Sequence, residues 1–92
     1  MEQSVKQLQQ TTKFEKDLAR MKKRGVDLRI LQQVVLTLLQ DEPLQVKHRD
    51  HPLSGNWKAH RECHLSPDWL LIYRTTTETV RLERTGTHSD LF

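Results

Sequence analysis

Apolar residues in the first part of the chain recur at the spacing of one face of a helix. The residues of this face are Phe14, Leu18 and Met21. Steps of three and four residues between apolar positions predict an amphipathic helix. Thr12 and Glu15 have the form of a capping box, which predicts that the helix begins at Thr12. Glycine is common just after a helix, so we expect this one to stop at Gly25.

A second helical pattern follows after only a few residues. Asp27 is a good N-cap residue, and the pattern ends before Pro43. Its broad apolar stripe comprises Leu28, Leu31, Val34, Val35, Leu38 and Leu39. Because the connection between the two helices is so short, we expect them to form an antiparallel hairpin.

The apolar period is absent from residues 41–56. Prolines, a serine and a glycine interrupt a polar stretch that also contains His48 and His51. Clusters of these residue types are typical of loops. We therefore predict a long loop here, with two histidines on it.

An alternating pattern occupies residues 57–65 and predicts a strand. Successive side chains of a strand point to opposite faces, so His60 and His64 would share one face and Cys63 would point to the other. Trp57 would begin this strand, and we expect both tryptophans, Trp57 and Trp69, to be core residues.

Two further strands are predicted after this one. Residues 66–68 have turn chemistry, and the run of residues 69–73 is rich in strand-forming residues and apolar on both faces. Such a run is typical of a central strand. After a polar turn over residues 75–78, alternating apolar and charged residues predict a last strand that ends at Gly86.

Together these elements predict an α+β fold, and we expect residues 1–92 to form a single domain. The N-terminal helical hairpin would pack on one face of an antiparallel meander sheet of three to four strands. The opposite face and the loops would then carry the polar groups. Residues 5–9 are too short and polar to classify by pattern, and we regard them as a candidate for an added edge strand.

Charge and cysteine content narrow the class of partner. The chain has 15 Lys and Arg against 12 Asp and Glu, a balance that favours polyanionic partners such as RNA, DNA or acidic proteins. Cys63 is the single cysteine, so no intramolecular disulfide can form. The first residues lack the apolar core of a signal peptide, and every apolar run is far shorter than the roughly 20 residues that cross a bilayer. We expect a cytoplasmic protein with no membrane partner.

All five histidines lie between positions 48 and 88. Cutting RNA without a metal needs a base for the 2′-hydroxyl, an acid for the leaving 5′-oxygen and a cation for the phosphorane. Imidazole can fill either proton role near neutral pH. Arg84 offers a fork of donors to phosphate oxygens, and Asp68 could orient a histidine. The sequence therefore contains the parts of a metal-independent ribonuclease, and we expect no cofactor.

Simpler interpretations stand beside this one. A single histidine in a small basic protein is more often a surface group or a hydrogen-bonded core group, and Asp68 after Pro67 is equally consistent with a plain turn. A metal site is the other alternative, with ligands drawn from His48, His51, His60, Cys63 and His64. Structural zinc sites usually use two or more thiolates, so the sequence favours no metal.

Three blocks of sequence together resemble the YafQ branch of RelE-type bacterial toxins, within the RelE/ParE toxin superfamily. They are DHPLSGNWK at 50–58, RECHLSPDWLLIY at 61–73 and ERTGTHSDLF at 83–92. The resemblance covers essentially the whole chain, including two basic helices before the sheet. It implies a RelE-like fold and a ribosome-dependent, metal-independent endoribonuclease. Such a toxin cuts mRNA in the ribosomal A site and so stops translation.

The resemblance also implies a site and partners. The functional positions of the family fall on His51, His64, Asp68, Arg84, His88 and Phe92. It leaves His48 and His60 outside these positions. The expected partners are mRNA on the ribosome, ribosomal RNA of the small subunit, and a cognate antitoxin of the DinJ/RelB type, a DNA-binding dimer.

The basic residues of the first helix gain a role under this interpretation, because ribosomal RNA is the surface they would meet. They are Lys13, Lys16, Arg20, Lys22, Lys23 and Arg24. A non-catalytic basic RNA-binding or regulatory module is the alternative that the sequence leaves open. In that case the same lysines and arginines bind RNA and the histidines do no chemistry.

Overall fold

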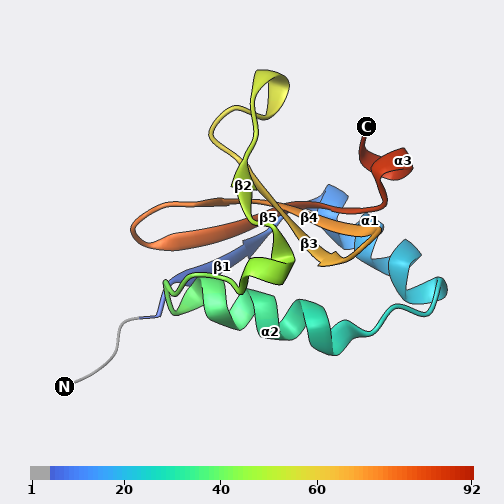
Figure 1. The fold of residues 1–92 in the computed structure, drawn as a ribbon, viewed down its shortest axis with the longest axis horizontal. Helices are drawn as coiled ribbons and strands as arrows, with labels where there is room; N and C mark the ends of the chain where they lie inside the picture. The colour runs from blue at the N-terminus through green and yellow to red at the C-terminus, as the bar shows by residue number, and fades with distance from the viewer. Residues whose placement is uncertain (1–4) are drawn as a thin grey trace.

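A computed structural model describes residues 5–92 of the chain. Five strands form one mixed sheet in the order β1-β5-β4-β3-β2. Helices α1 and α2 lie on one side of this sheet, whereas β2, the loop after it and α3 rise on the other side (Figure 1). The elements are β1 (Gln7–Gln10), α1 (Thr12–Lys23), α2 (Leu28–Leu39), η1 (Val46–His48), β2 (His51–Pro52), η2 (Gly55–Trp57), β3 (Arg61–Ser66), β4 (Trp69–Thr75), β5 (Thr79–Gly86) and α3 (His88–Leu91).

The predicted α+β class is confirmed, and the antiparallel meander is the part formed by β3, β4 and β5. The sheet has two more strands than this meander. The candidate edge strand exists as β1 and pairs in parallel with β5. The two residues of β2 pair with β3, so the predicted long loop contains one short strand and two 3-10 turns. Within residues 5–92, no helix combines the length and apolar character needed to cross a membrane.

Helix α1 begins at Thr12 as predicted, but the predicted capping box of Thr12 and Glu15 is wrong. Its N-cap is Thr11, whose hydroxyl accepts a hydrogen bond from the Phe14 amide at 2.9 Å. The same hydroxyl donates to the Glu83 carbonyl of β5 at 2.8 Å. Thr11 is therefore the N-cap in place of Thr12, because its hydroxyl binds both the start of the helix and strand β5.

The predicted boundaries of the helical hairpin are otherwise confirmed. Helix α1 ends before Gly25, whose φ of +84° is a conformation that glycine adopts without strain. Asp27 caps α2 by accepting from the Arg29 amide at 3.0 Å. These two caps set the short turn between α1 and α2.

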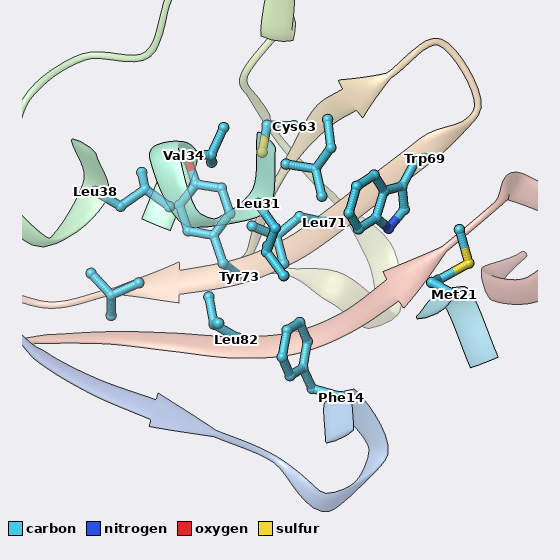
Figure 2. Close-up of a cluster of buried hydrophobic side chains, with 12 residues drawn as sticks. Phe14, Met21, Leu31, Val34, Leu38, Cys63, Trp69, Leu71, Tyr73 and Leu82 are labelled. Carbon is cyan, nitrogen blue, oxygen red and sulfur yellow. The ribbon is translucent and has the colours of Figure 1, made fainter. Parts of the chain in front are cut away.

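The main core lies between the helices and the inner face of the sheet (Figure 2). Phe14 of α1, Val34 of α2, and Leu71 and Tyr73 of β4 are almost completely buried there. The other members of this cluster are Met21, Leu31, Leu38, Cys63, Leu65, Trp69, Val80 and Leu82. Helices α1 and α2 bury their apolar faces on this core, as the helical spacing predicted.

The prediction of a strand from residue 57 is wrong for residues 57–60. Trp57 belongs to the 3-10 turn η2, and Ala59 has a φ of +71° that no strand residue adopts. The His60 amide donates to the Trp57 carbonyl at 3.0 Å, which closes a turn. Trp57 also lies outside the buried core, where only Trp69 fulfils the prediction. The alternation of residue types before Arg61 does not mark a strand, because residues 57–59 have the backbone conformation of turns.

Candidate active site

The outer face of the sheet carries polar residues around a small apolar floor. Leu70 and Ile72 of β4 are fully buried, yet they alternate with core residues of the same strand and so face outward. Leu70 pairs with His64 and Ile72 with Glu62 across β3. On the β5 side, Ile72 pairs with Arg84. Directly paired residues share a face of the sheet, so the side chains of His64, Glu62 and Arg84 lie beside Leu70 and Ile72 on the outer face.

Three of the five histidines form a row of rings that continues to Phe92, which we call the histidine row. His51 of β2 and His64 of β3 have ring centroids 6.4 Å apart. His64 and His88 of α3 follow at 6.2 Å, and His88 and Phe92 at 6.1 Å. The structure thus brings together side chains from β2, β3 and α3.

Both ring nitrogens of His51 face hydrogen-bond acceptors. Nδ1 lies 2.6 Å from the Arg49 carbonyl oxygen, and Nε2 lies 3.2 Å from Oε2 of Glu62. A carbonyl oxygen can only accept, so Nδ1 donates to Arg49, and the contact of Nε2 with Glu62 is an ion pair only when Nε2 carries a proton as well. Both nitrogens of His51 therefore face oxygen atoms that can accept a hydrogen bond or pair with a protonated ring.

Glu62 is the buried member of this pair. Its side chain is 6% exposed, and its second oxygen, Oε1, has no hydrogen-bond partner within the described part of the chain. Sequence reasoning missed this residue, because a glutamate in an alternating strand is normally solvated. The available signal was its position two residues before His64, which puts both side chains on the same face.

Asp50 fixes the backbone next to His51. Its Oδ1 accepts from the Tyr73 hydroxyl at 2.5 Å and from Nε of Arg61 at 3.2 Å. Burial and the hydrogen bond to Asp50 raise the pKa of Tyr73, so the phenol remains a donor. This contact ties the start of β2 to the central strand β4.

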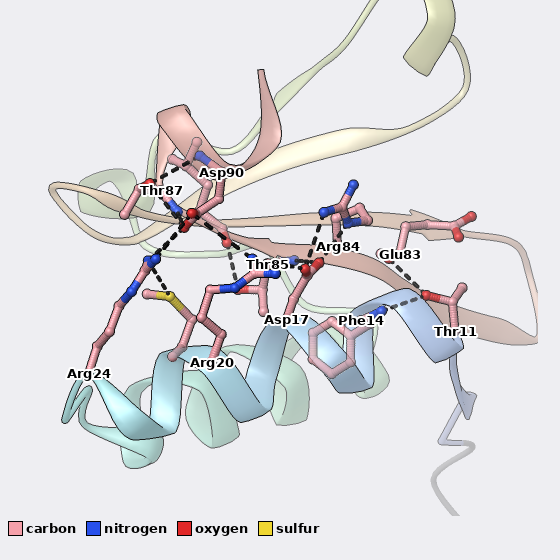
Figure 3. Close-up of polar contacts among 12 residues, drawn as sticks. Thr11, Phe14, Asp17, Arg20, Arg24, Glu83, Arg84, Thr85, Thr87 and Asp90 are labelled. Atoms are coloured by element: carbon pink, nitrogen blue, oxygen red, sulfur yellow. Dashed lines mark hydrogen bonds and ion pairs between the residues drawn. The ribbon is translucent and has the colours of Figure 1, made fainter.

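Arg84 is held by a buried carboxylate from α1. Nε and Nη2 of Arg84 donate to Asp17 at 2.6 and 3.1 Å, and the Thr85 amide donates to the same carboxylate at 3.2 Å (Figure 3). Strand β1 ends opposite Leu82, so Asp17 satisfies an edge amide that no strand covers. The hydrogen bond to Asp17 raises the pKa of Arg84. Sequence reasoning missed Asp17, which reads as part of a solvated helix face.

His88 and Asp68 approach one another without a hydrogen bond. Nδ1 of His88 lies 4.0 Å from Oδ1 of Asp68, and the two side chains are 59% and 74% exposed. Asp68 belongs to the turn between β3 and β4. Phe92 is also exposed, at 61%. This end of the histidine row is open to a ligand from solvent.

The remaining two histidines lie outside the row. Nδ1 of His48 donates to the His64 carbonyl at 2.7 Å, so His48 supports the backbone beneath the middle ring. Nε2 of His60 lies 2.8 Å from Oε2 of Glu83. The resemblance also left these two histidines outside the functional positions.

The basic residues of α1 have two kinds of surroundings. All six are exposed, but Arg20 and Arg24 make ion pairs with Asp90, at 4.0 and 2.7 Å respectively. In the described part of the chain, the four lysines of the set make no ion pair; they are Lys13, Lys16, Lys22 and Lys23.

The histidines and the cysteine that could form a metal site are divided between the two faces of the sheet. Cys63 is fully buried in the core, whereas His64 faces outward. Among residues 5–92, no group of three or more His, Cys, Asp or Glu side chains is arranged to hold a metal ion.

Comparisons with known proteins agree with the fold and the blocks of sequence. Residues 6–92 match the family described as bacterial toxin of type II toxin-antitoxin system, YafQ. The mRNA interferase toxin YafQ of Escherichia coli strain K12 is 42% identical over 80 residues, which cover 86% of this chain and 87% of that protein.

Two solved structures extend this similarity to the whole fold. A metal-bound toxin from Helicobacter pylori has a TM-score of 0.90 and 44% identity, covering 96% of this chain and 100% of that one. YafQ in the E. coli DinJ-YafQ toxin-antitoxin complex has a TM-score of 0.88 and 38% identity, covering 96% and 98%. The chain therefore belongs to the YafQ family of toxins from bacterial type II toxin-antitoxin systems.

Proposed function

We propose that this protein is a ribosome-dependent, metal-independent endoribonuclease that cuts mRNA in the ribosomal A site and so inhibits translation. The observation that carries the proposal is the row of three imidazoles on the sheet face next to a firmly held arginine. Acid, base and cation are the three groups that cleavage by the 2′-hydroxyl requires. The name mRNA interferase, given to the similar E. coli toxin, describes the same class of activity.

His51 is the proposed general acid. Its two ring nitrogens face the Arg49 carbonyl and the Glu62 carboxylate, so a ring that carries two protons is paired on both sides. A protonated imidazole can deliver a proton to the 5′-oxygen as the P–O5′ bond breaks. The leaving strand then ends in a 5′-hydroxyl.

His64 and His88 are the proposed groups near the 2′-hydroxyl. The ring of His64 makes no hydrogen bond within residues 5–92, so a nitrogen lone pair is free to accept the 2′-hydroxyl proton. The 2′-oxygen then bonds to phosphorus, and the upstream strand ends in a 2′,3′-cyclic phosphate. Asp68 would orient His88 once RNA closes the 4.0 Å separation between them.

Arg84 and Phe92 complete the proposed site. Nη1 of Arg84 is not used by Asp17 and can donate to the negatively charged phosphorane, while Asp17 keeps the guanidinium in place. The exposed ring of Phe92 would stack on a nucleobase and so bring the sugar and phosphate into line.

The exposed cations of α1 are proposed to bind ribosomal RNA of the small subunit, since phosphate contacts dominate such interactions. The set comprises Lys13, Lys16, Arg20, Lys22, Lys23 and Arg24. A DinJ-YafQ complex is known for the E. coli toxin, and we propose a cognate antitoxin of the DinJ/RelB type, a DNA-binding dimer, for this chain.

The decisive experiment maps the ends of mRNA cut on programmed ribosomes. A 2′,3′-cyclic phosphate and a 5′-hydroxyl are expected, with no cleavage of the same mRNA free in solution. His88→Ala should abolish the cut, whereas His60→Gln, a change outside the histidine row, should retain it. A 5′-phosphate product would contradict the mechanism. Ribosome or RNA binding without any cut by the native protein would favour the non-catalytic RNA-binding module.

A further inference from the structure

Helix α3, the last element of the chain, is too short to be stable by itself. Helix α3 consists of four residues, His88–Leu91, and an isolated turn of this length is unstable in water. It nevertheless carries two members of the histidine row, His88 and Phe92. Contacts with the rest of the protein must therefore keep these rings in position.

Asp90 makes the contacts that hold the turn from within. Its Oδ2 accepts from the Thr87 amide at 2.9 Å and from the Thr87 hydroxyl at 3.0 Å, and its own amide donates to that hydroxyl at 3.2 Å. These bonds form a capping box at the start of α3. Gly86 leaves room for this arrangement, because a Cβ there would lie 3.0 Å from both Cβ and Oδ2 of Asp90.

Arg24 connects the same carboxylate to α1. Its Nη1 donates to Oδ2 of Asp90 at 2.7 Å and its Nη2 to Oδ1 at 3.2 Å. The Asp90 side chain is only 14% exposed, so this forked pair is partly shielded from water.

One face of α1 thereby contacts two parts of the candidate active site (Figure 3). Asp17, Arg20 and Arg24 are spaced by three and four residues and so lie along one side of the helix. Asp17 holds Arg84, and Arg24 holds Asp90. Nη1 of Arg20 lies between the two carboxylates, 3.6 Å from Asp17 and 4.0 Å from Asp90.

We propose that Arg24 and Asp90 are positioning residues, and that their pairing, the Arg24–Asp90 clamp, places His88 and Phe92 for RNA cleavage. The inference rests on the proposed function. It assigns Arg24 a role inside the toxin that is separate from ribosome binding. It also assigns a role to Asp90, which lies outside the set of functional residues inferred from the sequence.

The first test uses the toxin alone and does not depend on catalysis. The Leu91 and Phe92 amides donate to the Thr87 and His88 carbonyls, so their hydrogen exchange reports whether α3 is formed. In Arg24→Gln these two amides should exchange at least threefold faster than in the native protein, because the turn loses its anchor. Arg29→Gln is the matched control, since Arg29 makes a similar forked pair with Asp27 away from α3.

The second test measures cleavage on programmed ribosomes at saturating toxin and at low toxin. Arg24→Gln and Asp90→Asn should each lower the rate at saturation by about tenfold, because His88 and Phe92 lose their alignment. The double variant should be no worse than either single variant, and Arg24→Lys should restore part of the rate. Arg29→Gln should cleave at the native rate.

The outcomes separate the clamp from the proposed function. Unchanged exchange of Leu91 and Phe92 in Arg24→Gln would overturn the clamp, whatever the cleavage result. An Arg24→Gln variant that is weakened only at low toxin, with a native rate at saturation, would overturn it too, because that pattern belongs to ribosome binding. If the native protein cuts no mRNA while exchange responds as expected, the proposed function fails and the structural clamp stands.

Discussion

Asp17 and Arg84 lie 67 positions apart in the sequence and are joined by two hydrogen bonds, of 2.6 and 3.1 Å, at the edge of strand β5. The Asp17 side chain is 3% exposed. It accepts a third hydrogen bond from the Thr85 amide. One carboxylate therefore closes the sheet edge and aims the arginine that faces the candidate active site.

Replacement of Asp17 should lower the stability of the protein more than replacement of an exposed carboxylate. Asp17→Asn leaves a partly buried guanidinium without its counter-charge, so we expect the free energy of unfolding to fall by about 2 kcal/mol. Urea denaturation measures this change. Asp27→Asn is the comparison, because Asp27 pairs with an exposed arginine and asparagine remains a good helix N-cap, so its loss of stability should be much smaller. Equal losses in both variants would show that burial of Asp17 is not important.

Replacement of Glu62 should separate stability from activity. Glu62→Gln keeps the shape of the side chain and removes a buried carboxylate that has an unpartnered oxygen, so stability should be retained or increased. Cleavage at saturating toxin should fall by about tenfold, because the carboxylate that pairs with Nε2 of the proposed acid His51 is lost.

Glu83→Gln is the matched control for Glu62. Glu83 pairs with His60, which lies outside the histidine row, so this variant should cut at the native rate. If Glu62→Gln also cut at the native rate, the proposed role of His51 as the acid would lose its structural support.

Acid should remove the contribution of Asp90 to stability. The hydrogen bonds from Arg24, and then those from Thr87, lower the pKa of Asp90 below its unfolded value of 3.8. A depressed folded pKa stabilises the protein at pH values above the unfolded pKa, and this stabilisation is lost as pH falls through the folded pKa. The native protein should therefore have a higher Tm than Asp90→Asn near neutral pH, and the difference should shrink below about pH 3.5.

Thermal unfolding across the acid range measures this convergence. Glu78→Gln, in the exposed turn between β4 and β5, provides a control for the general effect of removing one acidic group. A Tm difference for Asp90→Asn that stayed constant with pH would show that the charge of Asp90 is not the source of its effect.

Cys63 should resist modification until the protein unfolds. Its side chain is fully buried, and burial raises the pKa of its thiol, so little thiolate forms near neutral pH. Ellman's reagent should react with about one thiol per chain in denaturant and with almost none in buffer. Fast reaction of the native protein would indicate that the core between the helices and the sheet opens readily.

Removal of transition metals should leave cleavage unchanged, because imidazoles and Arg84 supply the proposed acid, base and cation. A similar toxin from H. pylori was solved in a metal-bound form, so the point needs a direct measurement. Toxin treated with a chelator selective for zinc and copper would be assayed on ribosomes whose magnesium is maintained. Loss of cleavage that added zinc restores would contradict the metal-independent mechanism.

Local patterns in the sequence predicted most of the elements, because helical spacing, caps and alternation depend on neighbouring residues. The two helices, the turn at Gly25, the buried run of β4 and the end of β5 were all predicted in this way. Three blocks of sequence identified the family, and the structure brings the histidines of those blocks together in one row.

Only the tertiary structure decided where local signals were ambiguous or absent. The capping-box pattern predicted Thr12 as the N-cap, whereas the observed N-cap is Thr11, whose hydroxyl also donates to the Glu83 carbonyl, 72 positions away. Asp17, Glu62 and Asp90 read as ordinary charged residues, because burial and pairing are set by elements that are remote in the chain. The histidines of the candidate site are thus identifiable from sequence, whereas the groups that hold Arg84, His51 and His88 emerge only when the strands and α1 are packed together.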